Sequence, residues 1–258
     1  MNFLKIINRI RYFIDKYLFR IYGGSILLED YKDIWKGRPV VVVGNGPSLK
    51  NTPLDDFIPF KSIGMNKINL IFDQTSWRPS VITCVNRHVV SQNRNFFSNT
   101  LIPTFVAWQS RFFLKKPKSP NVNYFFNSDK VYFSKNFHEV AGAGATVTFT
   151  AFQLAYYTGA DPVILVGVDH SFNAEGAPHE TQIRKGDDPN HFHPDYFANG
   201  VKWNLPDLET SEIAYKLADE AFKKDGRQIF DATVNGKLNI FPKIKIDEAL
   251  SILRLKKK

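Results

Sequence analysis

The chain has 258 residues, of which 43% are hydrophobic, and a formal net charge of +9 at neutral pH. This size and apolar content exclude a largely disordered chain, and the single cysteine excludes an internal disulfide framework. The positive charge favours anionic partners such as phosphorylated substrates, acidic lipids or nucleic acid.

Residues 1–24 predict an amphipathic basic helix, which the pair Gly23-Gly24 is expected to end. Its apolar side chains recur at the three- and four-residue steps of one helix face: Phe3, Ile6, Ile10, Ile14, Tyr17 and Ile21. Its basic side chains are Lys5, Arg9, Arg11, Lys16 and Arg20. They recur too often for a membrane span, and no signal-peptide pattern follows. Two interpretations stay open: a helix on an acidic membrane surface, or a helix docked on the domain or on a second subunit.

Residues 36–243 predict a nucleotide-binding α/β domain, and residues 244–258 a basic C-terminal helix or tail. Apolar runs predict these strands: Val40–Val43, Ser62–Asn66, Pro79–Val85, Pro103–Trp108, Asn121–Phe126, Pro162–Val168 and Gln228–Ala232. Helices are expected at Ala145–Thr158 and Asp207–Lys224. This alternation predicts a Rossmann-like α/β fold, with a mostly parallel sheet and helices on both faces. The aperiodic segment Ser171–Leu205 is expected to be a long lid loop over the active site.

A glycine-rich turn, Gly44-Asn45-Gly46-Pro47-Ser48, follows the first strand. Glycine permits a tight turn and close backbone approach to an anion, and a following helix would add exposed N–H groups. The spacing fits neither a dinucleotide fingerprint nor a Walker A loop. We expect Gly44, Asn45, Gly46 and Ser48 to bind a nucleotide phosphate; a plain strand–helix turn is the alternative.

Polar and small residues at other strand and helix ends extend this predicted nucleotide site. Ligands of open α/β sheets bind outside the carboxyl ends of the strands, and an Asn amide can both donate and accept hydrogen bonds. The alternatives are ordinary turn chemistry and tight helix–sheet packing. The residues expected to bind the nucleotide here are Asn66, Asn86, Gly144, Thr146 and Asp169.

Four of the six histidines lie in the segment 170–193, within or beside the expected lid. Histidine moves protons near neutral pH, so His191 or His193 is expected to be a general base. A second pair of metal ligands at a diagnostic spacing is missing, so no metal site is predicted. His170, Arg184 and Tyr196 are expected to contact substrate, although Arg184 also suits a solvated loop charge.

Several segments together resemble a known group of enzymes. They are VVVVGNGPSL (40–49), SIGMN (62–66), residues 142–146, ILVGVD (164–169) and NHFHPDYF (190–197). They resemble the bacterial sialyltransferases of glycosyltransferase family 42. They are still more similar to a sister group labelled 6-hydroxymethylpterin diphosphokinase-like, whose domain also occurs in flagellin nonulosonate transferases. The resemblance extends over roughly residues 36–243.

The sialyltransferase resemblance implies a metal-independent, inverting transfer of a nonulosonic sugar from a CMP-activated donor to a surface glycan or lipid-linked acceptor. In that pattern Asn45, Asn66 and Asn86 contact CMP, Gly144 lies beside it, and a histidine within 191–193 is the base. No further cofactor is implied. The sequence departs from the pattern at Ser171 and Phe172, where those enzymes place tyrosines that hold the leaving phosphate.

Two other functions have weaker support from the sequence. An ATP-dependent diphosphokinase acting on a pterin-like alcohol would need Mg²⁺, with Asp169, Asp187 and Asp188 as candidate ligands. A nucleic-acid binder is disfavoured, because the aromatic residues are not interleaved with Lys and Arg in a recognised motif. We expect a cytoplasmic protein, peripheral on the inner face of the cytoplasmic membrane, and leave self-association open.

Overall fold

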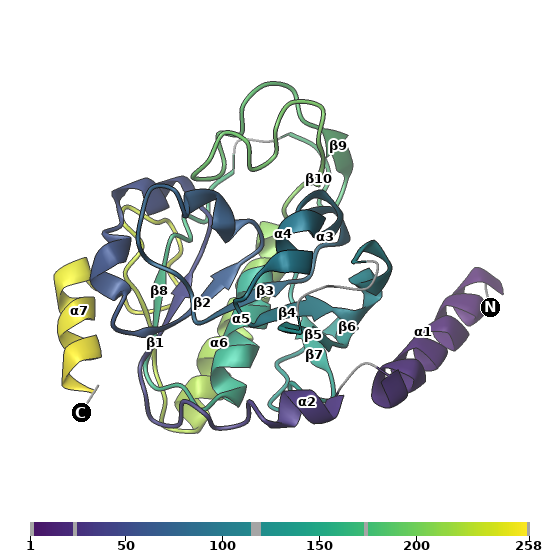
Figure 1. The fold of residues 1–258 in the computed structure, drawn as a ribbon, viewed down its shortest axis with the longest axis horizontal. Coiled ribbons are helices and arrows are strands. Elements are labelled where there is room, and N and C mark those ends of the chain that lie inside the picture. Colours follow the sequence, from purple (N-terminus) through teal and green to yellow (C-terminus); the bar gives the residue numbers. More distant parts are fainter. Residues whose placement is uncertain (1–2, 23–24, 115–119, 173–174, 257–258) are drawn as a thin grey trace.

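The computed structural model describes residues 3–22, 25–114, 120–172 and 175–256. Its described residues form a central seven-stranded parallel sheet of order β11-β8-β1-β2-β3-β4-β5 (Figure 1). Every strand expected from the sequence is confirmed to within two residues at each end. Their bounds are Val40–Val43 (β1), Lys61–Met65 (β2), Val81–Cys84 (β3), Thr104–Ala107 (β4), Val122–Phe125 (β5), Val163–Val166 (β8) and Ile229–Asp231 (β11).

Helices cover both faces of the sheet, as predicted, because successive side chains of a strand point to opposite faces. Val40 and Val42 join one hydrophobic core, whereas Val41 and Val43 join a second one. The first core also contains residues of α2 (Ser25–Glu29), α5 (Val147–Tyr157) and α6 (Leu208–Lys224). The second contains residues of the 3₁₀ helices η1 (Pro47–Asn51), η2 (Leu54–Phe57) and η3 (Ile68–Ile71), and of α3 (Arg87–Gln92), α4 (Arg94–Asn99) and α7 (Ile246–Leu255).

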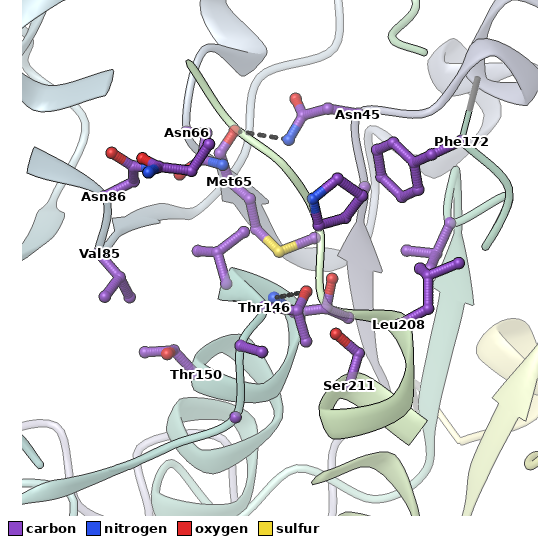
Figure 2. Close-up of a pocket in the computed structure, with 18 of the residues that line it drawn as sticks. Asn45, Met65, Asn66, Val85, Asn86, Thr146, Thr150, Phe172, Leu208 and Ser211 are labelled. Carbon is purple, nitrogen blue, oxygen red and sulfur yellow. Dashed lines mark hydrogen bonds between the residues drawn. The ribbon is translucent and has the colours of Figure 1, made fainter. Parts of the chain in front are cut away.

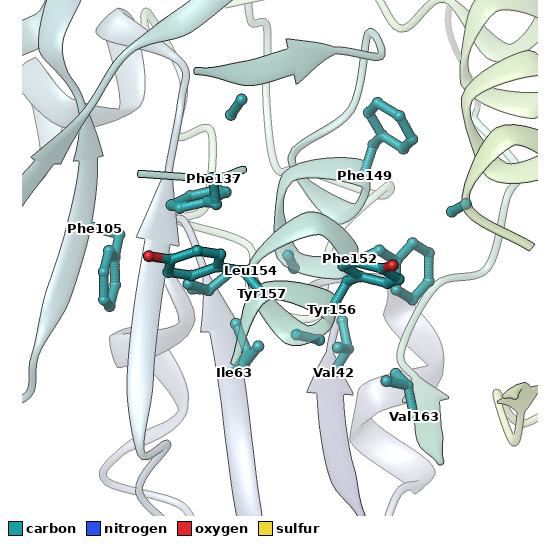
Figure 3. Packing of buried hydrophobic residues seen from close by; sticks show 14 of the residues in the cluster. Val42, Ile63, Phe105, Phe137, Phe149, Phe152, Leu154, Tyr156, Tyr157 and Val163 are labelled. Atoms are coloured by element: carbon teal, nitrogen blue, oxygen red, sulfur yellow. The ribbon is translucent and has the colours of Figure 1, made fainter. Parts of the chain in front are cut away.

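Helix α5 is the centre of the first core. Ten of its eleven residues are buried, because the sheet lies on one side of it and α6 on the other. Figure 3 shows Phe152 and Tyr156 near the strand residues Val42 and Val163, with Phe149 closer to the start of the helix. A helix that is apolar around its circumference is expected only in such a buried position. The first turn of α5 is thereby fixed against the carboxyl edge of the sheet.

Two small sheets lie outside the central one. β6 (Asn127–Val131) pairs in parallel with β7 (Ala141–Ala143), and β9 (Thr181–Ile183) pairs antiparallel with β10 (Lys202–Asn204). The β9–β10 pair belongs to the segment Ser171–Leu205, which we predicted to have no regular structure. A fourth 3₁₀ helix, η4 (Trp108–Phe113), follows β4. Figure 1 shows the β9–β10 pair projecting from one end of the sheet layer.

The N-terminal helix α1 (Phe3–Tyr22) docks on the domain through a face that the sequence analysis did not single out. Phe19 is fully buried in the first core, and Asp15 forms an ion pair with Arg111 at 2.7 Å. The predicted apolar stripe instead stays exposed at Ile10, Ile14, Tyr17 and Ile21. The side chains of Phe3 and Ile6, and the pair Gly23-Gly24, lie outside what the structure describes.

The two basic ends of the chain lie at opposite ends of the molecule, where Figure 1 shows α1 and α7. Leu253 of α7 is fully buried in the second core, so this helix also packs on the sheet. Residues 257–258 of the basic tail lie outside the described residues. Within the described parts of the chain, no helix is long and apolar enough to cross a membrane.

Candidate functional site

A cleft opens at the carboxyl edge of the sheet, next to β1 and β8. Chain order runs outward from β1 to β5 on one side and then returns to β8 and β11 on the other. Ligands of open α/β sheets bind at such a reversal of strand order. The cleft has a volume of about 630 Å³, which is enough for a nucleotide-sized ligand. Figure 2 shows part of its wall.

The structure brings most of the predicted site residues together around this cleft. Those that line it are Gly44, Asn45, Gly46, Asn66, Asn86, Gly144, Thr146, Asp169, His170, His191 and Tyr196. Ser48, Arg184 and His193 do not line it.

The glycine-rich turn after β1 packs tightly against the end of β8. A Cβ on Gly44 would lie 2.2 Å from the carbonyl oxygen of Gly167, and one on Gly46 would lie 1.9 Å from Asp169 Oδ2. The Ser48 amide donates to Asp169 Oδ1 at 3.1 Å, and the Ser48 hydroxyl donates to Oδ2 at 2.7 Å. The turn thus already binds an anion, the carboxylate of Asp169, and its glycines are required by packing.

The element after this turn is the short 3₁₀ helix η1, not the α-helix that would supply a set of free N–H groups. Of the predicted phosphate-binding residues, Ser48 is buried beneath the turn, whereas Gly44, Asn45 and Gly46 reach the cleft. The next helix N-terminus at the cleft is that of α5. There Thr146 caps the helix by accepting from the Thr148 amide at 3.3 Å.

The start of α5 combines tight packing with access to the cleft. A Cβ on Gly144 would lie 2.3 Å from Phe149 Cδ1, so this glycine is needed to seat the helix against its neighbours. Ala145 has a φ of 55°, in the left-handed region that non-glycine residues rarely adopt. Val147 and Thr150 of the first turns line the cleft. The positive end of the α5 dipole therefore points toward this space.

The three strand-end asparagines line the same side of the cleft, and two of them also have structural hydrogen bonds. The Asn45 side-chain amide donates to the carbonyl oxygen of Met65 at 3.1 Å, and its buried Oδ1 has no hydrogen-bond partner (Figure 2). Asn86 caps α3 by accepting from the His88 amide at 2.8 Å. Asn66 has a φ of 51°, which turns the chain sharply at the end of β2. These asparagines therefore both shape the turns at the strand ends and line the cleft.

His191 is the loop histidine that reaches the cleft. Its Nδ1 lies 2.7 Å from Asp188 Oδ2, and its ring stacks on the Tyr196 ring at 3.8 Å with an interplanar angle of 4°. Burial alone would raise the pKa of Asp188, but hydrogen bonding to His191 and the His191 charge outweigh it and hold that pKa below its usual value. An ionised Asp188 keeps the proton on Nδ1 and leaves the lone pair on Nε2 free to act as a base.

The neighbouring His193 has a different environment. Its Nδ1 accepts a hydrogen bond from the Asp195 amide at 3.1 Å, and the residue does not line the cleft. Of the two candidate bases, therefore, His191 lines the cleft and His193 does not, a difference that the sequence alone did not indicate.

The other predicted substrate-binding residues differ in position. His170 lines the cleft with its Nε2 3.0 Å from Glu212 Oε1. Arg184 is away from it, where its side chain donates to the Asp187 carbonyl and packs over the Trp203 ring. Tyr196 is fully buried, burial raises the pKa of its hydroxyl, and its ring stacks on that of His191.

The sequence analysis missed two basic residues, each directly after a strand-end asparagine. Lys67 is buried, and its Nζ donates to the carbonyl oxygen of Tyr196 at 2.5 Å. Burial lowers the pKa of Lys67 to about 8, although the nearby Asp188 opposes the shift. Arg87 is exposed and, among the described cleft-lining residues, is the one arginine or lysine. In the sequence, Asn66 and Asn86 are each followed directly by a basic residue, and this repeated pattern could have identified Lys67 and Arg87.

The carboxylates proposed as Mg²⁺ ligands do not share a site. Asp169 binds Ser48, Asp188 binds His191, and Asp187 is exposed in the loop. Within the described ranges, no three His, Cys, Asp or Glu side chains are grouped so as to hold a metal ion. Among the described residues, these three carboxylates therefore do not form one cluster of metal ligands.

A comparison with protein families shows which family contains this chain. Residues 19–175 match the family described as 6-hydroxymethylpterin diphosphokinase MptE-like. The chain belongs to the MptE-like family. The matched part contains β1 to β8 with all three strand-end asparagines, and it ends before Asp188 and His191. No curated protein matches the chain.

Proposed function

We propose that this MptE-like protein is a transferase that binds a nucleoside-phosphate donor in the cleft and passes part of it to an acceptor hydroxyl. The observation that carries the proposal is the pair of the buried Asp188 and the partly buried His191, whose Oδ2 and Nδ1 lie 2.7 Å apart, with His191 lining the cleft. A histidine oriented through Nδ1 can take the hydroxyl proton on Nε2 as the oxygen attacks. This proton transfer is common to phosphoryl and glycosyl transfer.

The remaining cleft residues support a nucleotide donor. The N-terminus of α5 and the Arg87 guanidinium offer positive charge to phosphate oxygens, while amides of Asn66 and Asn86 can bond ribose or base atoms. We place the phosphates near α5 and Arg87, because the β1 turn already holds the Asp169 carboxylate.

Of the possible donors, the family description favours ATP, with a pterin-like alcohol as acceptor. In that reaction the alcohol oxygen attacks the β-phosphorus of ATP, AMP leaves, and pyrophosphate is transferred. The dispersed carboxylates favour a second candidate, the CMP-activated nonulosonic sugar that the sialyltransferase resemblance implies. There the acceptor oxygen attacks the anomeric carbon and CMP leaves, with no metal ion required.

Calorimetric titration of the full chain with ATP, CTP and CMP, with and without Mg²⁺, tests the donor. Binding of ATP with release of AMP in the presence of 6-hydroxymethylpterin would establish the first candidate; CMP binding that is indifferent to Mg²⁺ supports the second. Failure of every nucleotide to bind would refute the proposal.

The base is tested separately by His191→Asn, with His193→Asn as the matched control. The first variant should lose turnover by about 10²- to 10⁴-fold while retaining nucleotide affinity, since it removes only proton transfer. The control should turn over normally. An equal loss of turnover in both variants, or no loss in either, would show that His191 is not the base.

A further inference from the structure

Helix α1 has one face fixed on the domain and an opposite face that nothing in the described chain covers. The fixed face is held by three contacts. Phe19 packs on Trp108 with ring centroids 5.8 Å apart, Tyr12 packs on Phe126 at 5.2 Å, and the Asp15 carboxylate binds Arg111. These contacts set the rotation of the helix about its axis, so its outward face is determined.

That outward face is apolar from Ile10 to Ile21. Ile10, Ile14, Tyr17 and Ile21 are 54%, 55%, 64% and 52% exposed, and their spacing places them on one stripe. Phe13 borders the stripe and is 58% exposed. Contiguous exposed apolar surface of this kind marks an interaction site.

Positive charge flanks the stripe on both sides. At 3.6 residues per turn, Arg11 lies along one border and Arg20 along the other, and both are exposed. The single acidic residue of the helix, Asp15, faces the domain and is neutralised by Arg111. The outward face therefore presents apolar side chains between cations, and the helix itself contributes no acidic side chain to it.

We propose that α1 docks this protein on a bilayer surface that contains anionic lipids. Apolar side chains flanked by Arg and Lys are the surface that an interfacial helix presents, with its apolar face in the acyl boundary and its cations on the headgroups. A second copy of the chain fits less well. Two such helices would bring their basic borders together, and 20 residues hold fewer heptads than a stable coiled coil needs.

Docking through α1 would also orient the cleft. Tyr12 and Phe19 contact Phe126, which directly precedes strand β6. Two residues of β6, Asn127 and Asp129, line the cleft. The β6 wall of the cleft would thus be held near the membrane. The docking proposal stands without the proposed activity, because it rests on α1 alone.

Vesicle sedimentation of the full chain tests the proposal, with phosphatidylcholine vesicles compared with vesicles that also contain phosphatidylglycerol. The wild type should bind the anionic vesicles, and salt should weaken that binding. Arg11→Gln with Arg20→Gln should bind roughly 30-fold more weakly, at about fivefold per charge removed. The double variant Ile10→Ser with Ile14→Ser should bind the anionic vesicles at least about tenfold more weakly.

A matched control is Ile213→Ser with Leu255→Ser, which alters exposed apolar residues on α6 and α7 and should bind like the wild type. All three double variants change exposed side chains, and unchanged thermal unfolding would show that they fold. Absent or charge-independent vesicle binding by the wild type would overturn the proposal. So would a dimer in light scattering that Ile10→Ser with Ile14→Ser dissociates, since a second copy would then cover the face.

Discussion

Replacing Asp188 by asparagine should disable the proposed base without preventing nucleotide binding in the cleft. The Asp188 carboxylate accepts three hydrogen bonds, from His191 Nδ1 at 2.7 Å, the Asn190 amide at 2.9 Å and the Phe197 amide at 3.2 Å. An asparagine has one acceptor oxygen where the carboxylate has two. Its NH₂ group must therefore face at least one of these donors, whichever way the side chain is turned.

The expected cost has two parts. A buried donor left facing another donor costs about 1–3 kcal/mol of folding stability. Loss of the charge that favours the protonated imidazole, together with loss of the fixed Nδ1 proton, should lower kcat by about 10²- to 10⁴-fold. The residues proposed to contact the nucleotide lie on other elements, so the Kd of the nucleotide should change less than about threefold.

The assay is steady-state turnover alongside calorimetric nucleotide titration, with Asp187→Asn as the control. Asp187 is the preceding residue and is exposed, so its change removes the same charge outside the pair. The control should keep its kcat. If Asp188→Asn turns over at the wild-type rate, or loses nucleotide affinity in parallel with kcat, the pair does not act as an oriented base.

Three other changes probe the rest of the site. Gly46→Ala should destabilise the fold by about 1–3 kcal/mol in urea unfolding, because its Cβ would meet Asp169 Oδ2; unchanged stability would show that the turn can move. Between about pH 8 and pH 10, the unfolding free energy should rise by about 2 kcal/mol more in the wild type than in Lys67→Met. In that window the unfolded amine stays protonated, with a pKa of about 10.4, while the buried amine has lost its proton; parallel pH profiles would contradict the shift. Arg87→Gln should weaken nucleotide binding about tenfold, whereas Arg94→Gln, an exposed change on α4, should not; equal affinities would place the phosphates elsewhere.

The central sheet could be predicted because its strands carry their own signal. Runs such as Val40–Val43 are apolar at every position, as strands covered on both faces must be. The pairs β6–β7 and β9–β10 carry no such signal, since strands as short as Ala141–Ala143 and Thr181–Ile183 have too few residues to show a period. For α1, periodicity predicted the helix but not its docked face, which uses Asp15 and Tyr12 as well as Phe19.

The candidate site was predictable where topology alone decides position. Asparagines at strand ends gather at one edge of a parallel sheet in any such fold. The remaining contacts join residues far apart in sequence, as in the bond from Ser48 to Asp169, 121 residues away, and that from Lys67 to Tyr196, 129 residues away. The choice of His191 depended on Asp188 three residues earlier, a local spacing that could have been recognised.

The long segment after β8 is pinned to the sheet at two points. The Phe192 amide donates to the carbonyl oxygen of Asn45, and Lys67 holds the carbonyl oxygen of Tyr196. The stretch around His191, which connects β9 to β10, is therefore tied to the ends of β1 and β2, while the β9–β10 pair projects beyond these contacts. Residue changes in β9 and β10 could therefore alter the surroundings of the cleft without moving His191, the proposed base. New preferences for the proposed acceptor could then arise while the proposed base stays in place.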